Sequence, residues 1–202
     1  MNSDKGRQIT VIIGLVSVIV FNFVSQAIPL GGATSAEIAN RIPDMLYFPA
    51  NYAFSIWGVI YAFLIAYGVF QALPRNAANP ALRRTGWLFV LSCVFNIGWL
   101  TSFHFNLFPL SMVMMLLLLG TLITIYIRLG IGVTAVSTGM KWCVHIPFSI
   151  YIGWITAATI TNAGYVLRDA GWDGFGIADQ TWAVIMLVIT GILSVAMVVL
   201  RR

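Results

Sequence analysis

The chain has few charged residues and almost no cysteine. Only 8% of its 202 residues are Asp, Glu, Lys or Arg, whereas 60% are hydrophobic. This balance excludes an ordinary soluble domain and indicates an integral membrane protein. The 2 cysteines, Cys93 and Cys143, lie in apolar runs and form no Cys-x-x-Cys pair, so we expect neither a disulfide framework nor a cysteine metal site.

Motifs for catalysis are also missing. There are no paired carboxylates, no nucleophile–base motif, no phosphate-binding loop and no acid inside an apolar run, which disfavours hydrolase and proton-pump functions. The 2 histidines, His104 and His145, fall near opposite ends of their runs, so we predict interfacial hydrogen bonds rather than a shared metal ion. We therefore predict no catalytic residues, no metal site and no required cofactor, and we disfavour an enzyme without excluding one.

What the chain does have is six apolar runs, each long enough to cross a bilayer core of about 30 Å as a helix. They cover approximately residues 9–28, 50–71, 84–105, 108–129, 141–162 and 181–200. These runs predict an all-α fold, a polytopic transmembrane helical bundle that forms one integral membrane domain over residues 1–202. The lipid bilayer is thus a predicted partner.

The basic residues lie at the ends of the runs and form no patch with interleaved aromatics, so we expect no nucleic acid as a partner. If the six runs alternate in direction, nine of the 11 Lys and Arg residues fall on one side, which predicts cytoplasmic termini and a cell inner membrane. These nine are Lys5, Arg7, Arg75, Arg83, Arg84, Arg128, Lys141, Arg201 and Arg202. The first run also resembles a signal peptide, but it is long for that role, so we expect a retained span.

The loop before the second run has its own signals. Thr34 and Glu37 have capping-box spacing, which predicts a short helix that continues through Arg41. Pro49 fits the first turn of the next helix, which we therefore expect to begin near Ala50. A loop of this length is either a lid or a linker.

Depth sorts the 7 tryptophans into two groups. Four lie at run ends or in the last loop and fit an aromatic belt: Trp87, Trp142, Trp172 and Trp182. Trp57, Trp99 and Trp154 instead each lie roughly 3 to 6 Å outward of the centre of a different run, so we expect them in one layer. That layer either lines a pocket or only packs the bundle.

Other aromatic and polar side chains share the helix faces of these tryptophans. Tyr61 lies one turn after Trp57. Asn96 and Phe103 share the face of Trp99. Tyr151 and Asn162 share the face of Trp154, and Gln26 ends the first run.

Three segments together resemble the TspO/MBR family, the tryptophan-rich sensory proteins related to the mitochondrial translocator protein. Family members have a Trp eight residues after a loop-ending proline and a Tyr four residues further, as in Pro49, Trp57 and Tyr61. They also have Asn-x-x-Trp with Phe four residues on, which matches residues 96–103. Finally, a Trp with an Asn eight residues later matches Trp154 and Asn162.

The chain departs from the family pattern at several positions. Phe48 replaces a proline, Asn51 replaces an aromatic residue, and Pro147 is seven rather than four residues before Trp154. The sixth run and its acidic loop are absent from the five-helix pattern, so the chain resembles a divergent branch with an extra C-terminal helix.

The resemblance implies a membrane-embedded binding or sensory protein for a flat hydrophobic ligand, such as a porphyrin, another tetrapyrrole or haem, in a pocket beneath the first loop. A small transporter and a light-dependent porphyrin-degrading enzyme are the alternatives, and a homodimer stays open. The expected ligand-binding residues are Gln26, Pro49, Trp57, Tyr61, Asn96, Trp99, Phe103, Tyr151, Trp154 and Asn162.

Overall fold

Five long apolar helices build the protein. The computed structural model describes residues 2–28, 30–39 and 51–199, and every regular element in those ranges is a helix. The long helices are α1 (Asn2–Ala27), α3 (Ile56–Ala72), α4 (Pro80–His104), α5 (Phe108–Arg128) and α7 (Ile146–Asp169). Each belongs to a stretch that is long and apolar enough to cross a membrane. The predicted all-α membrane fold is therefore confirmed.

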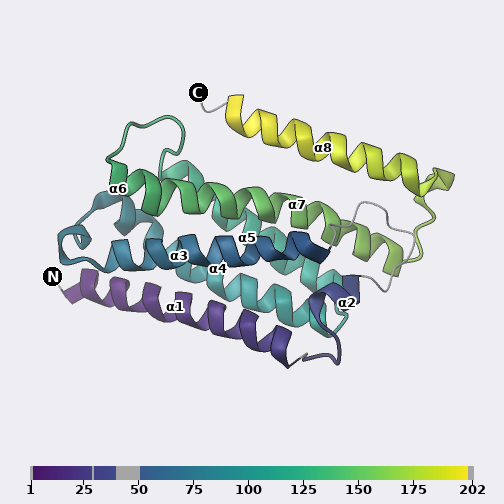
Figure 1. Cartoon of the computed structure of the whole chain (residues 1–202), viewed down its shortest axis with the longest axis horizontal. Coiled ribbons are helices and arrows are strands. Elements are labelled where there is room, and N and C mark those ends of the chain that lie inside the picture. The colour runs from purple at the N-terminus through teal and green to yellow at the C-terminus, as the bar shows by residue number, and fades with distance from the viewer. Residues whose placement is uncertain (1, 29, 40–50, 200–202) are drawn as a thin grey trace.

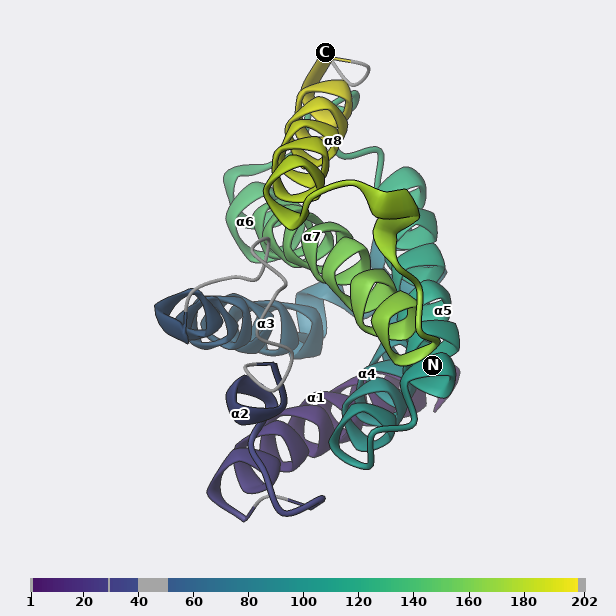
Figure 2. The same ribbon diagram turned by 90° about the vertical axis from the view of Figure 1, so that its right-hand side faces the viewer.

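The five helices close into a ring. Helix α1 packs on α3 and α4, α5 packs on α4 and α7, and α7 packs on α3, so the order around the ring is α1, α4, α5, α7, α3 (Figure 2). Inside the ring, Tyr67 of α3 contacts Phe89 of α4 and Phe148 of α7, with ring centroids 4.9 and 5.0 Å apart. These buried aromatic contacts join three helices that are far apart in the sequence.

Short elements cover the two ends of the ring (Figure 1). The end that holds the N-terminus, called here the N-terminal end, carries η2 (Pro74–Asn76), α6 (Thr138–Met140) and a π-helical segment, η3 (Lys141–His145). The opposite end, called the α2 end, carries α2 (Ser35–Ala39) and two 3₁₀ helices, η1 (Asn51–Ser55) and η4 (Gly174–Gly176).

The predicted capping box starts α2. The Thr34 N–H donates to the Glu37 carboxylate at 2.6 Å, and the Glu37 N–H donates back to the Thr34 hydroxyl at 3.3 Å. Residues 40–50, including Arg41 and Pro49, lie outside the described residues. The next α-helix begins at Ile56, later than the predicted start near Ala50, because the tighter 3₁₀ turn η1 precedes it.

A further helix, α8 (Asp179–Val199), lies outside the ring and alongside α7 (Figures 1 and 2). An ion pair between Arg168 and Asp179 joins the two helices. Trp182 also donates to the Gly174 carbonyl oxygen at 2.9 Å and so ties the connecting loop to α8. The apolar stretch found in α8, Asp179–Ile192, is shorter than the other five, so a sixth membrane crossing stays a prediction.

Candidate functional site

A cavity of about 550 Å³ opens beneath α2. Its walls come from α1, α3 and α4, and α2 and η1 close it at the α2 end of the ring. Most of the lining is apolar or aromatic. Three polar side chains, Asn22, Gln26 and Ser35, also face the cavity. Apolar walls with a few polar groups, at this volume, are typical of small-molecule sites.

An aromatic cluster centred on Trp57 forms the inner wall of the cavity. The Trp57 ring stacks on Tyr61 at 5.6 Å and 22°, and on Trp99 at 6.1 Å and 27°. It meets Trp154 edge-on, at 6.3 Å and 83°. The structure thus brings together the three tryptophans that depth along the helices placed in one layer.

The cluster also divides the space inside the ring. Trp57 and Trp99 line the large cavity on one side and a second cavity of only about 50 Å³ on the other. Phe103, Trp154 and Asn162 line only the small cavity. This volume is close to that of one or two water molecules, so the small cavity excludes a large ligand as it stands.

The ten residues expected from the sequence therefore separate into groups. Those on the large cavity are Gln26, Trp57, Tyr61 and Trp99. Those on the small cavity are Trp57, Trp99, Phe103, Trp154 and Asn162. Asn96 and Tyr151 line neither cavity, and Pro49 lies outside the described residues.

Asn96 and Tyr151 belong to a buried hydrogen-bond chain across three helices. The Asn22 amide donates to Asn96 Oδ1 at 2.9 Å, and the Asn96 amide donates to the Tyr151 hydroxyl at 3.1 Å. This chain joins α1, α4 and α7 beside the aromatic cluster. Because these groups are occupied by one another, their role here is to orient the helices.

Asn162 makes a second connection of this kind. Its side-chain oxygen accepts from the Trp99 indole N–H at 3.4 Å, and its amide and the Ser111 hydroxyl lie 3.2 Å apart. Asn162 therefore fixes the plane of the Trp99 ring and links α7 to α4 and α5.

Two polar atoms of the aromatic cluster make no hydrogen bond with the described residues. The Tyr61 hydroxyl and the Trp154 indole nitrogen are both buried, and neither has a hydrogen-bond partner in the described part of the chain. A buried donor without a partner costs about 1–3 kcal/mol. Tyr61 lines the large cavity with its ring, whereas its hydroxyl oxygen is not exposed there.

Residue Ser35 holds α2 over the cavities and lines both of them. Its hydroxyl oxygen accepts from the Gln26 amide at 2.9 Å and shares a hydrogen bond of 2.9 Å with His104 Nε2. The loop before α2 also packs closely against His104. A Cβ atom added to Gly31 would lie 1.8 Å from the His104 carbonyl oxygen, so only glycine fits at this position. The α1–α2 loop is thereby fastened to the end of α4.

The hydrogen bond expected at His104 is confirmed, and this side chain is fully buried under α2. The Nε2 atom of His145 is buried without a hydrogen-bond partner in the described part of the chain. His145 belongs to η3 at the N-terminal end, so the two histidines are at opposite ends of the ring. Across residues 2–28, 30–39 and 51–199, no group of three or more His, Cys, Asp and Glu side chains is placed to hold a metal ion.

Sequence reasoning missed several lining residues, among them Ser35 and Phe54. Ser35 follows the capping residue Thr34, and only the contact between α2 and α4 reveals its position over the cavities. Phe54 lies three residues before Trp57 and meets Trp154 at 6.4 Å, and its spacing from Trp57 was the available signal.

The comparison with protein families supplies the decisive match. A family model described as TSPO-like protein matches residues 8–202. The chain belongs to the TSPO-like family. Neither a search of curated proteins nor a search of solved structures gives a match.

The match confirms the resemblance carried by the tryptophan and asparagine spacings. It extends to residue 202 and so covers the additional C-terminal helix α8 as well. The protein is therefore a multi-pass membrane protein of the TSPO-like family over almost its whole length.

Proposed function

We propose that this TSPO-like protein binds a flat hydrophobic ligand, such as a porphyrin or another tetrapyrrole, in the cavity of about 550 Å³ beneath α2. The observation that carries the proposal is the stacked pair of indoles, Trp57 and Trp99, on the wall of that cavity. A flat aromatic ring gains offset-stacking energy on such a surface in addition to the burial of its apolar area.

The remaining lining suits a ligand with a polar edge. The side chains of Gln26 and Ser35 lie on the cavity beside α2. The carboxylates of a porphyrin would find donors there, while its ring stacked on Trp57. His104 is not placed to be an axial ligand of haem, because its Nε2 atom is hydrogen-bonded to Ser35 and the residue lines neither cavity.

A sensory or storage role follows from binding alone, with α2 as the lid. A transporter would use the same cavity, and the light-dependent enzyme would rely on excited Trp57 or Trp154. Binding ranks first because the Trp57–Trp99 wall closes the cavity toward the centre of the ring.

Tryptophan fluorescence tests the proposal. Titrating purified protein with protoporphyrin should quench the emission saturably, because a ring stacked on Trp57 lies within contact distance of the cluster. Uptake of porphyrin into sealed vesicles would favour the transporter, and new pigment products under light would favour the enzyme. Well-folded protein without saturable quenching would reject the porphyrin site.

A further inference from the structure

A separate cavity of about 700 Å³ lies at the N-terminal end of the ring, against α1, the end of α3, η2 and the start of α4. Polar side chains form one part of its lining, namely Lys5, Gln8 and the paired residues Asp4 and Arg83. Three isoleucines of α1 form another part: Ile9, Ile12 and Ile13. No residue of the aromatic cavity takes part.

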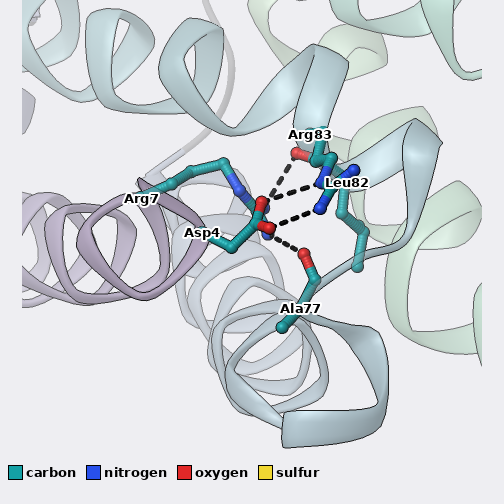
Figure 3. A network of polar contacts seen from close by, with 5 residues as sticks. All are labelled: Asp4, Arg7, Ala77, Leu82 and Arg83. Atoms are coloured by element: carbon teal, nitrogen blue, oxygen red, sulfur yellow. Dashed lines mark hydrogen bonds and ion pairs between the residues drawn. The ribbon is translucent and has the colours of Figure 1, made fainter. Parts of the chain in front are cut away.

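The polar part of the lining holds two cations, Lys5 and Arg83, and one carboxylate, Asp4. Figure 3 shows Asp4 together with Arg83 and the nearby Arg7. Arg83 Nε donates to the Asp4 carboxylate at 2.8 Å. Among the described residues, the buried Arg7 guanidinium donates only to neutral oxygens, the carbonyls of Leu82 at 3.0 Å and Ala77 at 2.8 Å. The single negative charge of Asp4 is thus paired with Arg83 and lies near Arg7, which does not line the cavity, so the positive charge of Lys5 is left in excess on the lining.

Lys5 is the cation that is free to bind a ligand. Its side chain is exposed on the cavity and has no hydrogen-bond or ion-pair partner among the described residues. An excess of cations beside an unpaired ammonium group favours an anion at this point.

The polar and apolar parts are arranged along one helix face. Lys5, Ile9 and Ile12 follow each other at intervals of four and three residues, so they share a side of α1. From Lys5 to Ile13 the helix rises about 12 Å. Ile9 and Ile13 are 60% and 59% exposed, so the apolar part opens sideways. The cavity therefore suits an amphiphile with an anionic head and an acyl chain.

A tight contact between α1 and α3 ends the cavity. A Cβ added to Gly68 would lie 2.4 Å from Leu15 Cδ2 and 3.5 Å from Ile12 Cδ1, so the two helices touch there. The aromatic cavity begins beyond this contact, with Ile19. The two cavities are thus separate sites on the same pair of helices.

We propose that this second cavity binds one anionic phospholipid, with its phosphate beside Lys5 and one acyl chain along Ile9, Ile12 and Ile13. The site does not depend on the porphyrin proposal. One bound phospholipid would account for the unpaired Lys5, for the excess positive charge on the lining and for the isoleucine groove.

Native mass spectrometry tests the headgroup. Wild-type protein is incubated with phosphatidylglycerol or with phosphatidylcholine that carries the same acyl chains, and the fraction of protein that retains one lipid molecule is measured. We expect phosphatidylglycerol to be preferred, and Lys5→Gln to reduce that affinity about fivefold. Arg75→Gln is the matched control, because Arg75 is exposed in η2 at the same end but does not line the cavity. Equal binding of the two lipids, or an equal loss in Arg75→Gln, would overturn the proposal.

A second pair of variants tests the acyl chain. Ile13→Trp should fill the groove and displace the lipid, whereas Val20→Trp, two turns along α1 and 53% exposed, should not. Glycerol phosphate, which lacks chains, should fail to compete. Effective competition by glycerol phosphate would show that the site takes a free anion instead, and lipid retention in Ile13→Trp would show that the acyl chain does not lie along Ile13; either result would overturn the proposal. Porphyrin quenching should be unchanged in Lys5→Gln, which separates this test from that of the aromatic cavity.

Discussion

Replacing Trp57 with Leu removes the ring surface on which we place the ligand. The structure gives the magnitude, because a ligand on the cavity side of Trp57 makes one offset contact with its indole, of about 0.5–1.5 kcal/mol beyond area burial. The affinity for protoporphyrin should therefore fall about 2- to 13-fold. Trp99→Leu should have a similar effect, since Trp99 lines the same cavity. Fluorescence titration, with pigment absorbance as a second readout, measures both.

Two further variants make this prediction specific. Trp142→Leu should leave the affinity unchanged, because Trp142 is 56% exposed and lines neither cavity. Trp154→Leu should weaken binding less than Trp57→Leu, because Trp154 touches Trp57 edge-on but lines only the small cavity. Equal losses in Trp57→Leu and Trp142→Leu would refute the assignment of the cavity. A loss far above 13-fold with a lowered melting temperature would mean collapse of the cluster instead.

Three other predictions follow from the same geometry. Tyr61→Phe removes a buried hydroxyl without a partner in the described chain, so it should leave the melting temperature equal or higher, with porphyrin affinity nearly unchanged because the hydroxyl is not exposed on the cavity. Asn96→Leu breaks the bonds to Asn22 and Tyr151 and should cost about 1–2 kcal/mol of stability in thermal unfolding, with porphyrin affinity nearly unchanged. Single cysteines in a cysteine-free background should be labelled from one side of the membrane at positions 34 and 173 and from the other at positions 76 and 139; a split within either pair would contradict the helix order.

Helix spacing was sufficient to predict the aromatic layer. Trp57, Trp99 and Trp154 have similar depths in the predicted spans, because a rise of 1.5 Å per residue fixes depth once the spans are known. Their ring contacts in the structure agree with that reasoning. Short-range signals also succeeded, because a capping box depends only on residues three apart, as at Thr34 and Glu37.

Which helix faces which depends on long-range packing, and here the sequence was insufficient. Asn96 and Tyr151 have the right depth for the predicted pocket, but the closing of the ring turns them toward each other. Ser35 could not be found either, because its place over the cavities depends on its bond to His104, 69 residues away. The division into a large and a small cavity likewise exists only once Trp57 and Trp99 are stacked.

The Trp57–Trp99 wall also bears on the choice between ligand binding and ligand transport. Movement from the large cavity toward α7 would have to displace the Trp57 ring from Tyr61, Trp99, Tyr151 and Trp154. At about 0.5–1.5 kcal/mol for each aromatic pair, the displacement costs about 2–6 kcal/mol. A ligand can drive such a change only if it binds the open arrangement better than the closed one by that amount. A ligand that stacks on the closed wall gains its energy without that cost, which is why the closed geometry supports binding or sensing ahead of transport.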